Sequence, residues 1–112
     1  MARFLMLLRS TARPGRSAEY SEWCSSRHFP DLMGVPAVLG IKRFRDIDAG
    51  EDGQDRFITL IELECDNPRD VVAEFGRRIA AGEMDTSDAY DSSTVTMQFA
   101  RMESELGEMF QP

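Results

Sequence analysis

The stretch RFITLIELECDNPRDVV, residues 56–72, contains the change of periodicity that decides the fold. Residues 56–64 are apolar at odd and even positions alike, which is typical of a short strand buried on both faces. Asn67 and Pro68 then supply an N-cap and a proline for the first position of a helix. The sequence therefore predicts a central strand that leads directly into a helix.

This helix is predicted to run from residue 68 to about residue 81, where Gly82 ends it. Its apolar residues recur at helical spacing and form one stripe, made of Val71, Val72, Phe75 and Ile79. A polar loop over residues 83–91 follows, so the helix is expected to pack by that stripe alone.

The last predicted strand covers about residues 93–102, because apolar and polar residues alternate there. The apolar set, expected to face the helices, is Val95, Met97 and Phe99. The polar set, expected to face the lumen of a barrel, is Thr94, Thr96 and Gln98. Their hydroxyl and amide groups would bind polar atoms of a ligand or hold water.

Upstream of residue 56, residues 38–45 predict another strand, in which Leu39 and Ile41 alternate with smaller or charged residues. Residues 46–55, DIDAGEDGQD, form an acidic, turn-rich loop, and we expect them to be a solvated hairpin tip. The two flanking strands are therefore predicted to pair as a hairpin.

Near the N-terminus, residues 3–9 predict a strand that is apolar on both faces, and residues 16–29 predict a helix. One face of that helix carries Tyr20, Trp23, Cys24, Arg27 and His28. Pro30 is expected to interrupt it, leaving an irregular stretch over residues 30–36.

The resulting order, β-α-β-β-α-β, predicts an α+β fold of the ferredoxin-like type, with a four-stranded antiparallel sheet. Strands 3–9 and 56–64 belong in its centre, and right-handed crossovers place both helices on one face. The other face still carries half of the apolar residues of the central strands. We therefore expect a homodimer, sheet face against sheet face, in the manner of a dimeric α/β barrel.

Composition limits the remaining possibilities. The chain has 112 residues, with 13 basic and 20 acidic side chains and a net charge of -7, so one domain over residues 1–112 is expected. The negative charge argues against nucleic acid, and no apolar run is long enough to span a membrane. No signal-peptide pattern is visible, which predicts a cytoplasmic location with Cys24 and Cys65 reduced. Two cysteines and one histidine predict no metal site.

The C-terminal tail, residues 104–112, is expected to extend the dimer by docking on the partner. Its apolar residues fall at helical spacing and are Leu106, Met109 and Phe110.

Residues 19–45, EYSEWCSSRHFPDLMGVPAVLGIKRFR, resemble the first helix and second strand of dimeric α/β-barrel proteins like the ethyl tert-butyl ether degradation (EthD) family. The positions that match that family's pattern are Trp23, His28, Pro30, Asp31, Val35, Pro36, Arg43 and Phe44, with Ala37 in place of the usual glycine. The stretch RFITLIELECDNPRDVV is also similar to this group.

The resemblance implies a cavity that admits small, often aromatic or polyketide-like compounds. Members of the superfamily include cofactor-free monooxygenases, lactone isomerases, polyketide cyclases, decarboxylases and haem-degrading enzymes. A haem site there uses a histidine near the second helix, which this sequence lacks, and no nucleotide or flavin fingerprint occurs, so no cofactor is expected.

His28 is the only histidine and the candidate acid/base, since its ordinary pKa suits proton transfer near neutrality. The alternative is that it caps the C-terminal end of the first helix. Asp31 is a candidate to orient the imidazole. Tyr20 and Trp23 share the helix face and would form either an aromatic wall for a planar substrate or part of the core. Cys24, on the same helix face and one turn before His28, is expected to be an inert buried thiol.

Glu62 lies in a central strand, where a buried carboxylate must be paired or have a raised pKa. It is either a second acid/base or one half of an ion pair with Arg43 or Lys42, and Arg43 is also a candidate substrate-binding residue.

These residues lead to two hypotheses about function. The first is a small cofactor-free lyase, cyclase or isomerase that acts on an aromatic or polyketide-like carbonyl compound through His28. The alternative is a non-catalytic homodimer that binds such a compound or assists another enzyme, or a cofactor-free monooxygenase in which Trp23 stacks on an electron-rich ring.

Overall fold

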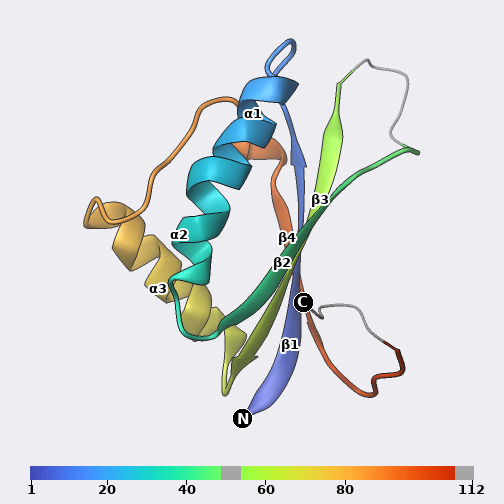
Figure 1. Ribbon diagram of the computed structural model, residues 1–112, viewed down its shortest axis with the longest axis vertical. Coiled ribbons are helices and arrows are strands. Elements are labelled where there is room, and N and C mark those ends of the chain that lie inside the picture. Colours follow the sequence, from blue (N-terminus) through green and yellow to red (C-terminus); the bar gives the residue numbers. More distant parts are fainter. Residues whose placement is uncertain (49–53, 108–112) are drawn as a thin grey trace.

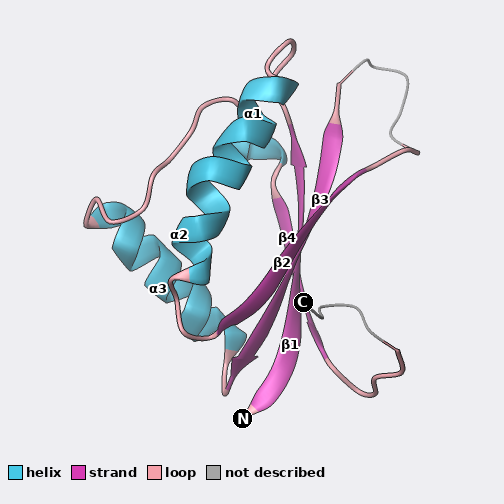
Figure 2. Cartoon of the chain, in the orientation of Figure 1, coloured by secondary structure: helices cyan, strands magenta, loops and turns pink. Residues whose placement is uncertain are grey.

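The computed structural model describes residues 1–48 and 54–107 and contains one four-stranded antiparallel sheet (Figures 1 and 2). Its strands are β1 (Ala2–Thr11), β2 (Val38–Arg45), β3 (Arg56–Cys65) and β4 (Thr96–Arg101). They lie in the order β2-β3-β1-β4, so the two strands that are apolar on both faces occupy the centre, as predicted. The ferredoxin-like fold and the predicted hairpin of β2 and β3 are confirmed.

The strand register decides which residues share a face. Met6 lies opposite Ile61 and Leu8 lies opposite Thr59, and these side chains point toward the helices. Because side chains alternate along a strand, Leu5, Leu7 and their partners on β3 point to the other face. All helices lie on one side of the sheet (Figure 1), which leaves the second face without a helical layer.

The first helical segment is longer than predicted, and the prediction that Pro30 interrupts it is wrong. Helix α1 (Ser17–Trp23) continues through a π-helical turn (Cys24–His28) into α2 (Phe29–Met33). In this turn the Phe29 N–H donates to the Cys24 carbonyl, five residues back. Pro30 then stands in the first turn of α2, where its missing N–H costs no helical hydrogen bond. The π-helical turn therefore allows the helix to continue through Pro30.

Helix α3 (Pro68–Ala80) begins and ends where the sequence predicts. The Asn67 side chain accepts a hydrogen bond from the Arg69 N–H, and Gly82 has a φ of 75°, which suits glycine beyond a helix end. Val71 and Phe75 are buried against the sheet. No helix within residues 1–48 and 54–107 is long and apolar enough to cross a membrane.

Strand β4 is shorter than predicted. A single 3-10 turn occupies Ser92–Thr94, because the Asp91 carboxylate accepts hydrogen bonds from the N–H and the hydroxyl of Ser93. Thr94 therefore belongs to this turn, while Thr96 and Gln98 remain in the strand.

The tail leaves β4 on the side of the sheet opposite the helices (Figure 1). There, residues 102–107 and the sheet residues Leu5, Glu62 and Ala100 enclose a shallow hollow. Leu106 is fully exposed. The other two members of the predicted apolar patch, Met109 and Phe110, lie outside the described residues, as does part of the acidic hairpin loop.

Candidate functional site

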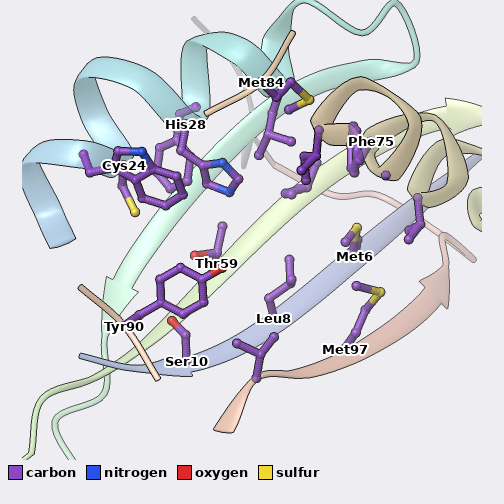
Figure 3. A pocket seen from close by; sticks show the side chains of 18 of the residues that line it. Met6, Leu8, Ser10, Cys24, His28, Thr59, Phe75, Met84, Tyr90 and Met97 are labelled. Carbon is purple, nitrogen blue, oxygen red and sulfur yellow. The ribbon is translucent and has the colours of Figure 1, made fainter. Parts of the chain in front are cut away.

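A cavity of about 320 Å³ lies between the helices and the covered face of the sheet (Figure 3). Its walls come from every layer of the fold, and apolar side chains dominate them. The residues from the sheet include Met6, Leu8, Ser10, Thr59, Ile61 and Met97, and those from the helices and loops include Tyr20, Trp23, Cys24, His28, Phe75, Met84 and Tyr90. A concave, mostly apolar space with a few polar groups is typical of a small-molecule site.

His28 lines this cavity, and Figure 3 shows its ring directed from the helix toward the sheet. The ring stacks on Trp23 with 4.5 Å between ring centroids and 12° between the planes. Its Nδ1 is buried and has no hydrogen-bond partner among the described residues. The helix continues to Met33, so the alternative in which His28 caps a helix end is wrong.

Burial makes this imidazole a neutral group at physiological pH. Loss of hydration lowers the pKa of His28 from 6.5 to about 4, and the negative charge of Asp31 opposes that effect only in part. A neutral imidazole can accept a proton from a bound compound, as a general base must, while the lowered pKa makes it a weaker base than an exposed imidazole.

Three aromatic side chains form one wall of the cavity beside His28. Tyr20, Trp23 and Tyr90 contact one another, with ring centroids 6.3 Å apart for Tyr20 and Trp23, 5.0 Å for Tyr20 and Tyr90, and 6.0 Å for Trp23 and Tyr90. The Tyr20 hydroxyl is 2.7 Å from the Ser10 hydroxyl, and burial raises the pKa of Tyr20 to about 12. Tyr20 is therefore a neutral phenol that serves as wall and as hydrogen-bonding group.

Ser10 and Thr59 are polar residues of the cavity that the sequence analysis missed. Both are buried in central strands, and the Leu8–Thr59 and Ser10–Phe57 pairs place them on the helix side. A signal was present, because Ser10 continues the alternation of Met6 and Leu8. The predicted strand stopped at residue 9 and so excluded Ser10.

Cys24 is buried at the edge of the cavity, one turn before His28. Burial raises the pKa of its thiol, and the nearby Arg43 guanidinium offsets this only in part. The protonated thiol is a weak nucleophile, in agreement with the inert thiol predicted from the sequence.

Arg43 does not line the cavity. It lies behind the aromatic wall, with its guanidinium 3.6 Å from the Phe57 ring centroid and 4.8 Å from that of Tyr20. One nitrogen donates to the Ser21 hydroxyl, while Nε and Nη2 are buried without a partner in the described residues. Its contacts with Phe57 and Tyr20 stabilise the position of the aromatic wall.

Glu62 lies on the opposite face of the sheet from His28, because it pairs in register with Leu5. It is 4% exposed, and its carboxylate is 3.3 Å from an Arg3 guanidinium nitrogen. Arg3 is therefore an ion partner of Glu62, and the predicted pairing with Arg43 is wrong, since Arg43 faces the helices. Lys42, the other predicted partner, lies on the same face of the sheet as Glu62. The two candidate acid/base residues are separated by the sheet.

The other predicted site residues also lie outside the cavity. The Asp31 carboxylate accepts a hydrogen bond of 3.2 Å from the Asp85 N–H, which directs it away from the imidazole. Thr96 and Gln98 pair with Arg9 and Leu7, so they belong to the helix-free face, where both are exposed.

The donor set offers little to a metal ion. Within residues 1–48 and 54–107 there is no group of three or more histidine, cysteine, aspartate or glutamate side chains that could hold one. The polar side-chain groups of the cavity are two phenols, two aliphatic hydroxyls, a protonated thiol, an indole N–H and one imidazole.

No protein-family model matches the chain, and no curated protein matches it. Solved structures do. SnoaB, a cofactor-independent oxygenase from Streptomyces nogalater whose structure is that of a variant, is 13% identical with a TM-score of 0.62, over 96% of this chain and 100% of that chain.

Two further structures place the fold. An EthD family protein from Bacillus halodurans is 15% identical with a TM-score of 0.56, over 92% of this chain and 99% of that one. A dimeric ferredoxin-like protein from an uncultured marine organism is 8% identical with a TM-score of 0.60, over 95% and 100%. At these identities the likeness concerns the fold alone, which is ferredoxin-like, and the predicted EthD-like resemblance is confirmed at that level.

Proposed function

We propose that the protein is a homodimeric, cofactor-independent oxygenase that acts on a neutral, electron-rich aromatic carbonyl compound bound beside His28. The observation that supports this most is the neutral imidazole in an apolar cavity, with its Nδ1 unpaired in the described residues and its ring stacked on Trp23. A base held in this way lines the cavity and lies next to a surface suited to planar rings.

The substrate itself must supply the electrons in such a reaction. His28 takes a proton from an acidic C–H or O–H of the bound compound, and the resulting anion transfers electrons to O2. For a methylene group beside a carbonyl-bearing ring, one oxygen atom becomes a new carbonyl and the other leaves as water. The C=O bond replaces two C–H bonds, and the four electrons lost by carbon reduce O2 completely.

The cavity favours this oxygenase over the lyase, cyclase or isomerase that the sequence analysis put first. Those reactions commonly move a proton off one atom and onto another, which calls for an acid and a base in the same site. Glu62 and Asp31 are directed elsewhere, and burial raises the pKa of Tyr20 to about 12, which makes its phenol a weak proton donor. A single base is sufficient when O2 accepts the electrons, and the shared fold with SnoaB supports this choice.

The test uses anthrone, a planar ketone with a doubly benzylic methylene group, and follows oxygen uptake and quinone formation. We expect the protein to accelerate both, and His28→Phe to lower kcat by about 10²- to 10⁴-fold while retaining the fold. Arg27→Gln is the matched control, because this neighbouring side chain is exposed and lies outside the cavity. An unchanged rate in His28→Phe would remove the imidazole from the mechanism.

The homodimer in this proposal uses the helix-free face. Phe44, on that face of β2, is 45% exposed, and Leu5, Leu7 and Ile58 are only half-buried in one chain. A soluble chain rarely leaves such an apolar sheet face uncovered, and a second copy covers it with two-fold symmetry. The marine ferredoxin-like protein of the same fold is itself dimeric.

A further inference from the structure

Gly76 is an unexpected residue for its place in the fold. It lies inside α3, where glycine destabilises a helix relative to alanine, and it is one of the residues that line the cavity. It is not among the glycines with a positive φ, so its backbone conformation does not require glycine.

Close packing does not explain Gly76 either. A Cβ atom added there would meet nothing within 4 Å beyond the helix's own backbone and its chain neighbours. Gly34 shows the contrast, because a Cβ atom at that position would lie 3.2 Å from the Asp31 carbonyl oxygen. The space at Gly76 is open and continuous with the cavity, so the missing side chain leaves a gap in the helix wall.

Two large apolar side chains that line the same cavity as Gly76 are partly exposed to solvent. Ile79, one turn further along α3, is 42% exposed, and Met97 on β4 is 43% exposed. Both also line the cavity, so each contacts the interior and the surface. The Arg69 guanidinium lies 5.2 Å from the Phe99 ring centroid, which places α3 alongside β4.

We propose that the ligand enters and leaves the cavity between α3 and β4, and that Gly76 keeps this portal open. This inference rests on the proposed ligand site beside His28. An apolar substituent of the ligand, at the end remote from His28, contacts Ile79 and Met97 in the mouth. Gly76 thus determines how fast a ligand exchanges and how bulky its remote end can be.

The experiment measures exchange of 1-naphthol, a neutral planar phenol, in oxygen-free buffer so that no oxidation competes with binding. Trp23 is the only tryptophan and lines the cavity, so quenching of its fluorescence reports binding in stopped flow. In Gly76→Leu the leucine occupies the gap without meeting other atoms, and leucine is a good helix former. We expect the association and dissociation rates both to fall about tenfold, with Kd changing much less, because a narrowed passage is crossed in both directions.

Two further variants separate the portal from other effects. Ala73→Leu is the matched control, since Ala73 is exposed on the same helix and does not line the cavity, and its rates should stay within about twofold of wild type. Ile79→Ala should widen the mouth and raise both rates. Gly76→Ala should raise the melting temperature by about 4 to 8 °C, as expected where glycine is not structurally required.

The outcomes distinguish the two proposals. If wild type binds 1-naphthol and Gly76→Leu exchanges it at the wild-type rates, the portal is elsewhere and the ligand site stands. A rise in Kd through faster dissociation alone would mean that the leucine fills the cavity, which also overturns the portal. If wild type does not quench with 1-naphthol at all, the proposed ligand site fails and the portal fails with it.

Discussion

The two faces of the sheet are built from alternate residues of the same strands, yet they differ in how their polar groups are paired and in what covers them. The helix side keeps a cavity of about 320 Å³ with a buried imidazole whose Nδ1 has no partner in the described residues. On the helix-free side the buried carboxylate of Glu62 is paired with Arg3, and apolar residues form a face that one chain leaves half-covered. An unsatisfied buried polar group beside a cavity calls for an explanation such as a ligand site, whereas an apolar face that one chain leaves partly exposed is typical of an interface.

The largest expected effect comes from placing a charge on the helix-free face. Leu7 lies in the middle of β1, opposite Leu60 and Gln98, and is half-buried. Leu7→Asp would bury an unpaired carboxylate in the proposed interface, so we expect the dimer dissociation constant to rise at least about 1000-fold, or about 4 kcal/mol.

Light scattering over a dilution series measures this effect. Met33→Asp is the control, because Met33 is exposed on the helix side and should leave the dimer unchanged. If wild type is already a monomer at every concentration, the proposed dimer through the helix-free face is wrong.

The second prediction concerns pH and the helix side. The pKa of His28 is about 4 in the folded chain, against 6.5 for an ordinary exposed imidazole, so between these values the unfolded chain binds a proton that the folded chain does not. The contribution of His28 to stability is therefore complete above pH 6.5 and is lost as the pH falls toward 4. The shift corresponds to a loss of about 3 kcal/mol in the free energy of unfolding.

Urea unfolding of wild type and His28→Phe at pH 7, 5.5 and 4 isolates the contribution of His28 to the free energy of unfolding. Other groups contribute equally to both proteins, so the difference between them should change by about 3 kcal/mol across the series. A constant difference would show that the imidazole titrates alike in the folded and unfolded chains, and that the cavity does not exclude water from it.

The contrast also explains what the sequence could predict. Strand order followed from residues 56–64 and 3–9, because strands apolar on both faces need neighbours on both sides. The helix after Asn67 followed from local capping chemistry, which acts within a few residues. Both features depend on local or periodic residue patterns, so they can be predicted without knowledge of the tertiary structure.

The site was less predictable because it depends on register. A shift of one residue moves a side chain to the other face, and this placed Glu62 away from His28 and Arg43 behind Tyr20. The helix continues through Pro30 because of a π-helical turn, and no residue spacing in the sequence indicates such a turn. The sequence therefore predicts that the first helix ends at the proline. His28, Tyr20 and Trp23 were found together because they share one helix face, a relation that sequence spacing does record.

The smallest expected effect tests whether the two faces are independent. Glu62 faces away from the cavity, and its partner Arg3 has a side chain that is 45% exposed, so water screens the ion pair in a single chain. Glu62→Gln keeps the shape and retains a hydrogen-bond acceptor for Arg3. We expect the free energy of unfolding of the chain to fall by less than about 1 kcal/mol.

Anthrone turnover and 1-naphthol binding in Glu62→Gln should stay within about twofold of wild type, because the sheet separates Glu62 from His28. The dimer should weaken more than the fold, since a partner that covers Arg3 would remove the screening water. Turnover that falls with Glu62→Gln as it does with His28→Phe would contradict this separation and would mean that the sheet faces act as one site.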